Sequence, residues 1–194
     1  AWLNVYDVPI VYFPKFFHPD PTVIRQSGFL RPNISNTDTL GRSLYTPYFF
    51  VIDQNKDLTF KPTFFLDGKF SLQSEYRQKT KNTKHIADIS LTKGYKSDKE
   101  DNGDTKSHFF LNSEIDLAFD SLILSKLDIN LEKTSSDTYL KIFEFNSPLL
   151  LGSLSELNSS IKLELENENF DLMTSFEIFE TLSGSNSDRF TYVL

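Results

Sequence analysis

The feature of this sequence that most restricts its possible folds is a regular alternation of apolar and polar residues over long stretches. From residue 58 to 66 every second side chain is apolar, and the same period returns near residues 70, 86, 111, 123, 161 and 170. A period of two is typical of a β-strand with two different faces. As helices, these segments would scatter Glu114, Asp128 and Glu164 around the cylinder instead of along one stripe. The pattern therefore predicts an all-β fold, an antiparallel up-and-down meander.

The lengths of the alternating segments and of their connections suggest where such a meander could reside. The segments run roughly 9–14 residues, whereas a strand in a soluble domain averages about 5–6 and a tilted strand that crosses a bilayer needs about 9–11. Asp67-Gly68 predicts a two-residue hairpin. Both long connections, at 96–106 and at 135–148, fall after odd-numbered strands, and we expect the second to be ordered. A transmembrane β-barrel explains this asymmetry, but alternation alone leaves a soluble β-sandwich equally open.

Composition excludes several classes of function. With 20 basic and 27 acidic residues the formal charge is −7, which argues against nucleic-acid binding because a binder needs a basic face. The chain has no cysteine, so Cys-zinc sites and thiol nucleophiles are absent. His18, His85 and His108 lack metal-ligand spacing, and there is no phosphate loop or nucleophile elbow. We therefore expect no enzyme, no metal site and no cofactor.

Seven of the eight prolines lie within the first 62 residues, in a region that resembles a known family. The resemblance rests on residues 8–14 (VPIVYFP), 18–21 (HPDP), 25–32 (RQSGFLRP), 40–41 (LG), 47–49 (PYF) and 75–77 (EYR), and more weakly on 136–140 (SDTYL). Together and in this order these stretches resemble LptD, the family of lipopolysaccharide-assembly outer-membrane proteins also called OstA or organic solvent tolerance protein. The rest of the chain matches that family only in its alternation.

The resemblance implies an architecture and a location. LptD-like proteins have a periplasmic β-jellyroll followed by a very large antiparallel barrel in the outer membrane of Gram-negative bacteria. On this mapping residues 1–26 are the end of the periplasmic jellyroll (1–13) and a connector (14–26), and residues 27–194 are about the first ten barrel strands. The connector carries Pro14, His18, Pro19, Asp20 and Pro21. Since the chain begins without a methionine and ends within a strand-like run, we expect it to be an internal fragment.

The resemblance also implies a transport function and partners. The family inserts lipopolysaccharide into the outer leaflet through a lateral gate, with an LptE-like lipoprotein inside the barrel and an LptA-like periplasmic bridge. Pro32 and Pro47 match prolines that weaken the first two barrel strands in this family, and the physics agrees because each proline removes one ladder N–H. Without the family match, both would be assigned to bulges or strand ends. Pro62, one strand further on, is assigned a structural role only.

Two alternative functions stay open beside lipopolysaccharide export. One is a general, porin-like diffusion barrel, and the other is a soluble β-sandwich that acts as a binding module. An acidic interior would also suit an anionic glycolipid poorly. Divalent cations could bridge the two, or the sugars could follow a wall formed by other parts of the protein.

Overall fold

The structure is a computed structural model that describes residues 2–5, 8–12, 25–95, 104–143, 145–150, 154–182 and 189–194. Its elements, in chain order, are β1 (Trp2–Val5), β2 (Val8–Tyr12), β3 (Gly28–Phe29), β4 (Asn33–Thr37), β5 (Gly41–Tyr45), β6 (Tyr48–Asp53), β7 (Lys56–Phe65), β8 (Phe70–Lys79), β9 (Thr83–Tyr95), β10 (Asp104–Asp116), β11 (Leu124–Thr134), α1 (Tyr139–Phe143), β12 (Glu156–Asn167), β13 (Phe170–Thr181) and β14 (Phe190–Val193). The all-β prediction is confirmed.

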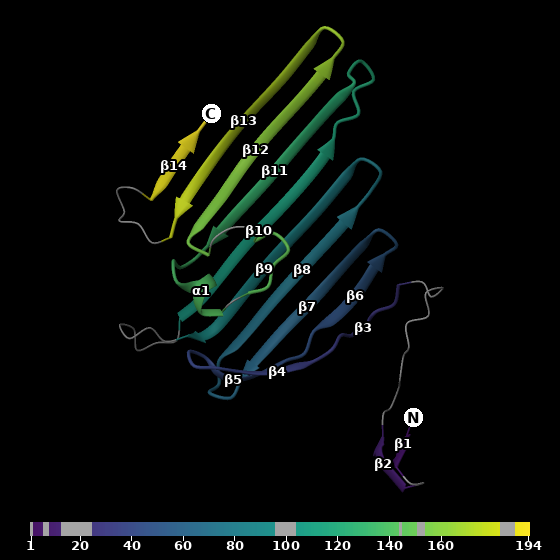
Figure 1. Cartoon of the computed structure of the whole chain (residues 1–194), viewed down its shortest axis with the longest axis vertical. Coiled ribbons are helices and arrows are strands. Elements are labelled where there is room, and N and C mark those ends of the chain that lie inside the picture. The colour runs from purple at the N-terminus through teal and green to yellow at the C-terminus, as the bar shows by residue number, and fades with distance from the viewer. Residues whose placement is uncertain are drawn as a thin grey trace.

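In the described part of the chain, twelve strands form one antiparallel sheet, and β1 and β2 form a separate two-stranded sheet. From β7 to β14 each strand pairs with the next in sequence, whereas at the start β5 and β6 both pair with β7, and β4 and β3 pair with β5 and β6. Figure 1 shows the large sheet as a meander from β4 to β14. From β7 to β13 the strands are 10 to 13 residues long, within the predicted range. If β3 with β4, and β5 with β6, are each counted as one interrupted ribbon, the twelve strands make ten ribbons.

The connections differ between the two ends of the sheet. At one end the turns are short, such as 54–55 between β6 and β7 and 168–169 between β12 and β13. At the other end β9 ends at Tyr95 and β10 begins at Asp104, and β11 ends at Thr134 and β12 begins at Glu156. Both long connections therefore share one end, as the alternation of strand direction requires.

The hairpin at Asp67-Gly68 exists, but the predicted two-residue loop is wrong. The Phe65 amide donates to the Lys69 carbonyl oxygen at 3.1 Å, which leaves residues 66–68 as a three-residue loop. Gly68 has a φ of 86°, and Asp67 is not among the described residues with positive φ. A two-residue type I′ turn needs positive φ at both central residues, whereas a three-residue loop needs it at one. The sequence signal is the same for both, because glycine provides the left-handed residue in each.

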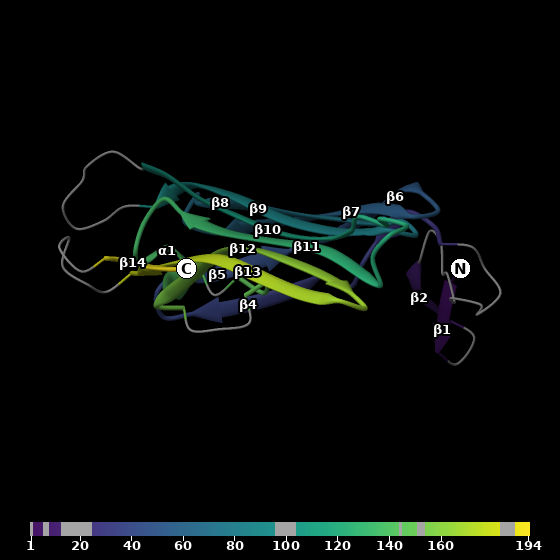
Figure 2. The same cartoon turned by 90° about the horizontal axis from the view of Figure 1, so that it is seen from above.

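The sheet is curved, and the connection between β11 and β12 lies in its hollow. Figure 2 shows that the sheet is curved, with β8 and β9 above and both flanks, β4 with β5 and β12 with β13, below them, and Figure 1 places these two flanks on opposite sides of α1. The prediction of an ordered segment here holds for 135–143 and 145–150, although the short helix was not expected. The buried apolar cluster of the molecule lies around this segment and consists of Phe110, Tyr139, Leu140, Leu149, Leu157 and Leu182. We call residues 135–150, of which residue 144 is not described, the plug.

The two faces of the sheet have opposite polarity, and the polar face is the concave one. Tyr139 in the plug bonds Ser90 and Thr92, so these side chains point into the hollow. Ile89 and Leu91 alternate with them on the convex face, where 44% and 52% of their surfaces are exposed. Buried polar groups therefore face inward while large apolar groups face outward. Among the residues that the structure describes, no helix is both long enough and apolar enough to cross a membrane.

Candidate functional site

The first two ribbons of the sheet are interrupted where the sequence has proline. β3 ends at Phe29 and β4 begins at Asn33, so residues 30–32 separate them, with Pro32 last. β5 ends at Tyr45 and β6 begins at Tyr48, with Pro47 in the gap. The register across the two ribbons shifts by one at the break, so residues 30–32 lie opposite Thr46 and Pro47 alone. This is the extra residue of a β-bulge, which weakens the ladder locally.

Pro47 removes one hydrogen bond between the first and second ribbons. The Leu30 amide donates to the Pro47 carbonyl oxygen at 2.8 Å. In an antiparallel ladder two residues paired in this way exchange two bonds, and Pro47 has no N–H to return the second. The net loss is about 0.5–1.5 kcal/mol in water and is larger where water cannot satisfy the orphaned carbonyl oxygen.

Pro62 likewise removes one hydrogen bond from the ladder between the second and third ribbons. The Thr46 amide donates to the Pro62 carbonyl oxygen at 3.1 Å, and Pro62 cannot donate in return. Thr46 also lies beside the break that contains Pro32. Pro32, Pro47 and Pro62 therefore form a row across three adjacent ribbons, although the sequence assigned Pro62 a structural role.

The nitrogen of Pro32 faces the other side of the first ribbon. Backbone N–H groups of successive residues point to opposite sides of a strand. Because the Thr46 N–H points toward β7, the Tyr45 N–H points toward β4, where Tyr45 pairs with Asn33. Pro32 precedes Asn33 and so faces the outer side of β4, where the described chain provides no partner strand. All five residues of β4 are exposed. The three prolines thus each remove one N–H donor. Pro32 removes it from the outer edge of the sheet, Pro47 from the ladder between the first and second ribbons, and Pro62 from the ladder between the second and third.

The plug is fixed to the concave face by a buried polar network. The Tyr139 hydroxyl lies 2.8 Å from both Ser90 Oγ and Thr92 Oγ1. Further along the plug, the Asn146 carbonyl oxygen accepts from Gln73 Nε2 at 3.2 Å and from Lys61 Nζ at 3.5 Å. Burial raises the pKa of the Tyr139 phenol, which keeps it neutral.

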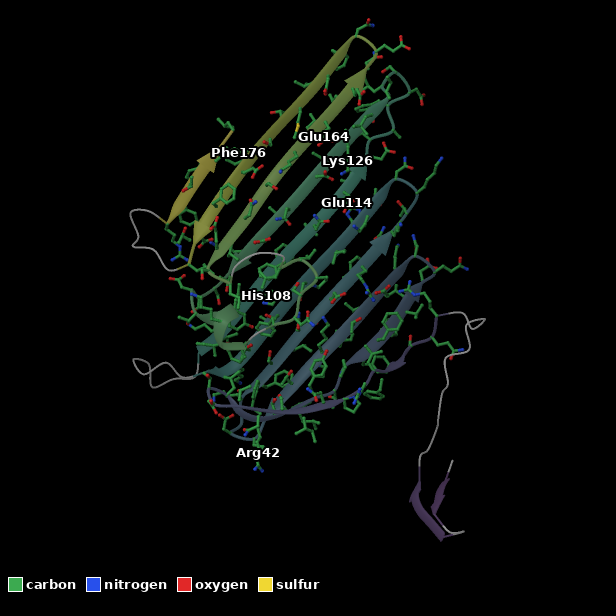
Figure 3. All side chains as sticks on the ribbon, viewed as in Figure 1. Arg42, His108, Glu114, Lys126, Glu164 and Phe176 are labelled. Atoms are coloured by element: carbon green, nitrogen blue, oxygen red, sulfur yellow. The ribbon has the colours of Figure 1, made fainter. Side chains whose placement is uncertain are left out.

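Ser90, His108 and Asp88 have the residue types of a hydrolytic triad, but their arrangement is structural. Ser90 Oγ lies 2.7 Å from His108 Nδ1, and His108 Nε2 lies 3.4 Å from Asp88 Oδ1. The serine hydroxyl is shared with Tyr139, and none of the three residues is more than 2% exposed. A nucleophile needs an approach for its substrate, and the plug covers this one. Figure 3 places His108 beside α1.

Many charges of the concave face are paired. Carboxylates and cations of neighbouring strands or positions form the ion pairs Lys61–Glu75, Arg77–Asp57, Lys84–Glu114, Lys126–Asp128 and Lys162–Glu177, with N to O distances from 2.7 to 3.0 Å. In Figure 3, Glu114, Lys126 and Glu164 lie on adjacent strands beyond the plug. The pairs offset only part of the negative charge, because Glu132 and Glu164 lie on the same face beside them, so the acidic interior suggested by the sequence persists beyond the plug.

The structure separates the residues singled out from the sequence. Pro32 and Pro47 lie at adjacent breaks, whereas Pro14, His18, Pro19, Asp20 and Pro21 lie outside the described residues. His85 bonds Ser113 at 2.7 Å and alternates with the concave residues, so it is on the opposite face from His108. In the described ranges, no group of three or more His, Asp or Glu residues is arranged to hold a metal ion. Sequence reasoning missed the network around Tyr139, for which residues 136–140 were the one signal.

Comparison with known proteins gives one consistent relationship. No family model matches the chain. The LPS-assembly protein LptD of Pseudomonas aeruginosa strain LESB58 is 28% identical over 175 residues, which are 88% of this chain and 18% of that protein. LPS-assembly protein LptD of Pseudoalteromonas translucida is 28% identical over 185 residues, 89% of this chain and 23% of that protein. LPS-assembly protein LptD of Ectopseudomonas mendocina is 36% identical over 81 residues, 42% of this chain and 8% of that protein. The chain thus spans less than a quarter of the length of these relatives.

Proposed function

The chain belongs to the LptD family, and on that premise we propose that it forms the first wall of a transmembrane β-barrel that inserts lipopolysaccharide into the outer leaflet. The barrel would lie in the Gram-negative outer membrane. Residues 27–194 would be its first strands, and residues 1–26 would be the end of a periplasmic jellyroll with its connector. Lipopolysaccharide would be the substrate, and the protein would act as a conduit without catalysis or a cofactor.

The inverted polarity of the sheet supports a position in the membrane. Strands of 10 to 13 residues suit a tilted crossing of the hydrocarbon layer, which needs about 9–11. Large apolar side chains stay exposed on the convex face over several strands, including Phe64, Leu91, Phe109, Ile161 and Leu172. Soluble proteins rarely expose a continuous apolar surface of this extent. In the described part of the chain no second layer covers it, as a β-sandwich would require.

The interruption of the first two ribbons at Pro32 and Pro47 is the observation that carries the proposal of a lateral gate. A closed barrel joins its first strand to its last, and the first ribbon here has few ladder partners and an N–H missing from the outer side. Lipopolysaccharide leaving sideways must separate the strands at that join. Each missing hydrogen bond lowers the free energy needed for the separation by about 0.5–1.5 kcal/mol or more.

Two protein partners follow from the same proposal. An LptE-like lipoprotein would occupy the barrel interior, and the paired charges of the concave face beyond the plug offer it a polar surface. An LptA-like bridge would deliver lipopolysaccharide to the periplasmic jellyroll. The bilayer is the third partner. A nucleic acid is not expected, because the chain is acidic.

The test is to lock the join in the full-length protein. One cysteine would be placed in β4 and another in the last strand of the full-length chain, and lipopolysaccharide reaching the cell surface would be measured. We expect export to stop and to resume after reduction. A matched disulfide between positions 162 and 175, which face each other in β12 and β13, should leave export unchanged. Normal export through a locked join would disprove the lateral gate.

A further inference from the structure

A cavity lies directly behind the proline-interrupted ribbons. Its volume is about 400 Å³, and its walls are β4, β5, β7 and β8 on the sheet side and the plug on the other side. This volume falls in the range of roughly 300–1,000 Å³ that is usual for small-molecule sites. The cavity shares its wall with the proposed gate, because Tyr45 of β5 and Asn33 of β4 line it on either side of the first ladder.

Most polar groups that line the cavity are uncharged. Ser35 and Ser43 lie on neighbouring strands with their hydroxyl oxygens 2.8 Å apart, and Thr63 follows on β7. Hydroxyls both donate and accept hydrogen bonds, and they can rotate to suit a partner. Such a wall can bond a ligand that itself carries many hydroxyl groups.

The other part of the lining is aromatic. Phe143 of the plug meets Phe65 of β7 edge to face, with ring centroids 6.2 Å apart. Both rings border the cavity, together with Tyr45. Aromatic faces provide apolar surface at fixed positions, against which the C–H faces of a sugar ring can pack. A pyranose carries hydroxyls at its rim and C–H groups on its faces, and the cavity offers a partner for each.

The charge of the lining decides between neutral and anionic ligands. Lys61 is the charged residue among the described side chains that line the cavity. Its Nζ lies 2.7 Å from Glu75 Oε2, and 14% of the side chain is exposed. The pair leaves no free positive charge for a phosphate or a carboxylate, which need a cation or several amide donors.

We propose that this cavity binds uncharged sugar units of lipopolysaccharide while the molecule waits at the gate. The proposal rests on the proposed function and names the part of the substrate that this wall recognises. Because β4 and β5 form both the cavity wall and the interrupted ribbons, separation of the ribbons at Pro32 and Pro47 would also open the cavity sideways. The sugars would then leave together with the lipid part.

Photo-crosslinking in cells that express the full-length protein tests this proposal. A photoreactive amino acid would replace Ser43, which faces the cavity, or its neighbour Leu44, which faces the convex side. Two strains would be compared, one with complete lipopolysaccharide and one whose lipopolysaccharide lacks the neutral sugars but keeps the lipid and its phosphates. We expect crosslinking at position 43 to be at least about tenfold stronger with the complete molecule, as the loss of one or two hydrogen bonds would give. Crosslinking at position 44 should not depend on the sugars.

Equal crosslinking at position 43 in the two strains would overturn the proposal, because the contact would then be to lipid or phosphate. Absence of any crosslink at position 43 in either strain would also overturn it. A second variant, Ser43→Tyr, fills the cavity, and we expect it to slow export of complete lipopolysaccharide while export of the truncated form continues. Leu44→Tyr is its control. The disulfide that locks the join tests the proposed lateral gate independently of the cavity. Export that stops on locking, together with equal crosslinking in the two strains, would support the gate and contradict sugar binding in the cavity.

Discussion

β12 and β13 pair without a break from Glu156 to Asn167, whereas the first two ribbons of the same sheet pair in two short pieces. Both regions are antiparallel, both alternate in polarity, and both present apolar side chains on the convex face. They differ in backbone donors, because Pro32 and Pro47 of the first two ribbons lack an N–H, as does Pro62 of the adjoining third ribbon. The continuity of the hydrogen-bond ladder therefore varies along this sheet while the polarity of its two faces stays the same.

A proline placed in the continuous region is the strongest test of this difference. Ile129→Pro in β11, between Ser113 and Ile161, should remove a ladder bond where both neighbours are fully paired. An orphaned group in lipid has a cost of at least about 2 kcal/mol. We expect the full-length variant to lose most of its folded, heat-modifiable form on gels, while Ile129→Val keeps it. Normal folding of the proline variant would mean that ladder continuity does not separate the two regions.

Tyr139→Phe tests how the plug is held against the continuous strands. The change removes the hydroxyl that bonds Ser90 and Thr92 in a buried site. We expect the plug to be less stable by about 1–3 kcal/mol, measured as faster proteolysis within residues 135–150 of the assembled protein. Tyr192→Phe is the control because 63% of Tyr192 is exposed. Equal protection in the two variants would contradict the anchoring role.

The same tyrosine predicts a pH dependence. Because burial raises the pKa of Tyr139 above its unfolded value of about 10, its contribution is fully present below that value and is lost as the pH rises through the higher folded pKa. Protection of the plug should therefore fall at strongly alkaline pH in the wild type. In Tyr139→Phe this part of the pH dependence should disappear. A profile unchanged by the substitution would show that other groups control it.

Gly68→Ala probes the hairpin that connects β7, the strand of Pro62, to β8. Nothing lies within 4 Å of the added Cβ, so the cost comes from the φ of 86°. We expect a loss of about 1–2 kcal/mol, read from denaturant unfolding of the full-length protein. Gly28→Ala is matched to it, since its surroundings are also open and its φ is outside the left-handed region. Equal effects of the two changes would argue against the left-handed turn.

Pro47→Ala should produce the smallest change in stability, and it acts directly on the missing hydrogen bond between the first two ribbons. The new N–H can return a bond to Leu30, worth about 0.5–1.5 kcal/mol, so amide exchange at Leu30 should slow and lipopolysaccharide export should fall. Pro62→Ala should act in the same way on the amide of Thr46, and Pro148→Ala in the plug should change neither. Global unfolding is a poorer measure, because loss of a proline also frees the unfolded chain. Unchanged exchange at Leu30 would contradict the missing-bond account.

Much of the sheet could be predicted from residue order because strand geometry is local. Side chains of a strand point alternately to its two faces, so the period of two gives the strands, their lengths and their meander without any knowledge of partners. The same pattern cannot distinguish a lipid-facing surface from a core, and the sandwich stayed open for that reason. The Asp67-Gly68 pair predicted the position of a turn but not its length, because one left-handed glycine suits both loops.

Contacts between distant segments are a different matter. Tyr139 meets Ser90 and Thr92 across more than forty residues, and Thr46 meets Pro62 across a register that is set by whole ribbons. No local pattern encodes such pairs, since they depend on how far the sheet curls and on which way the plug turns after β11. The alternation in the sequence therefore determines the strands by itself. The plug, the cavity lined by uncharged groups and the row of three prolines form only when the sheet curves and the ribbons pair in register.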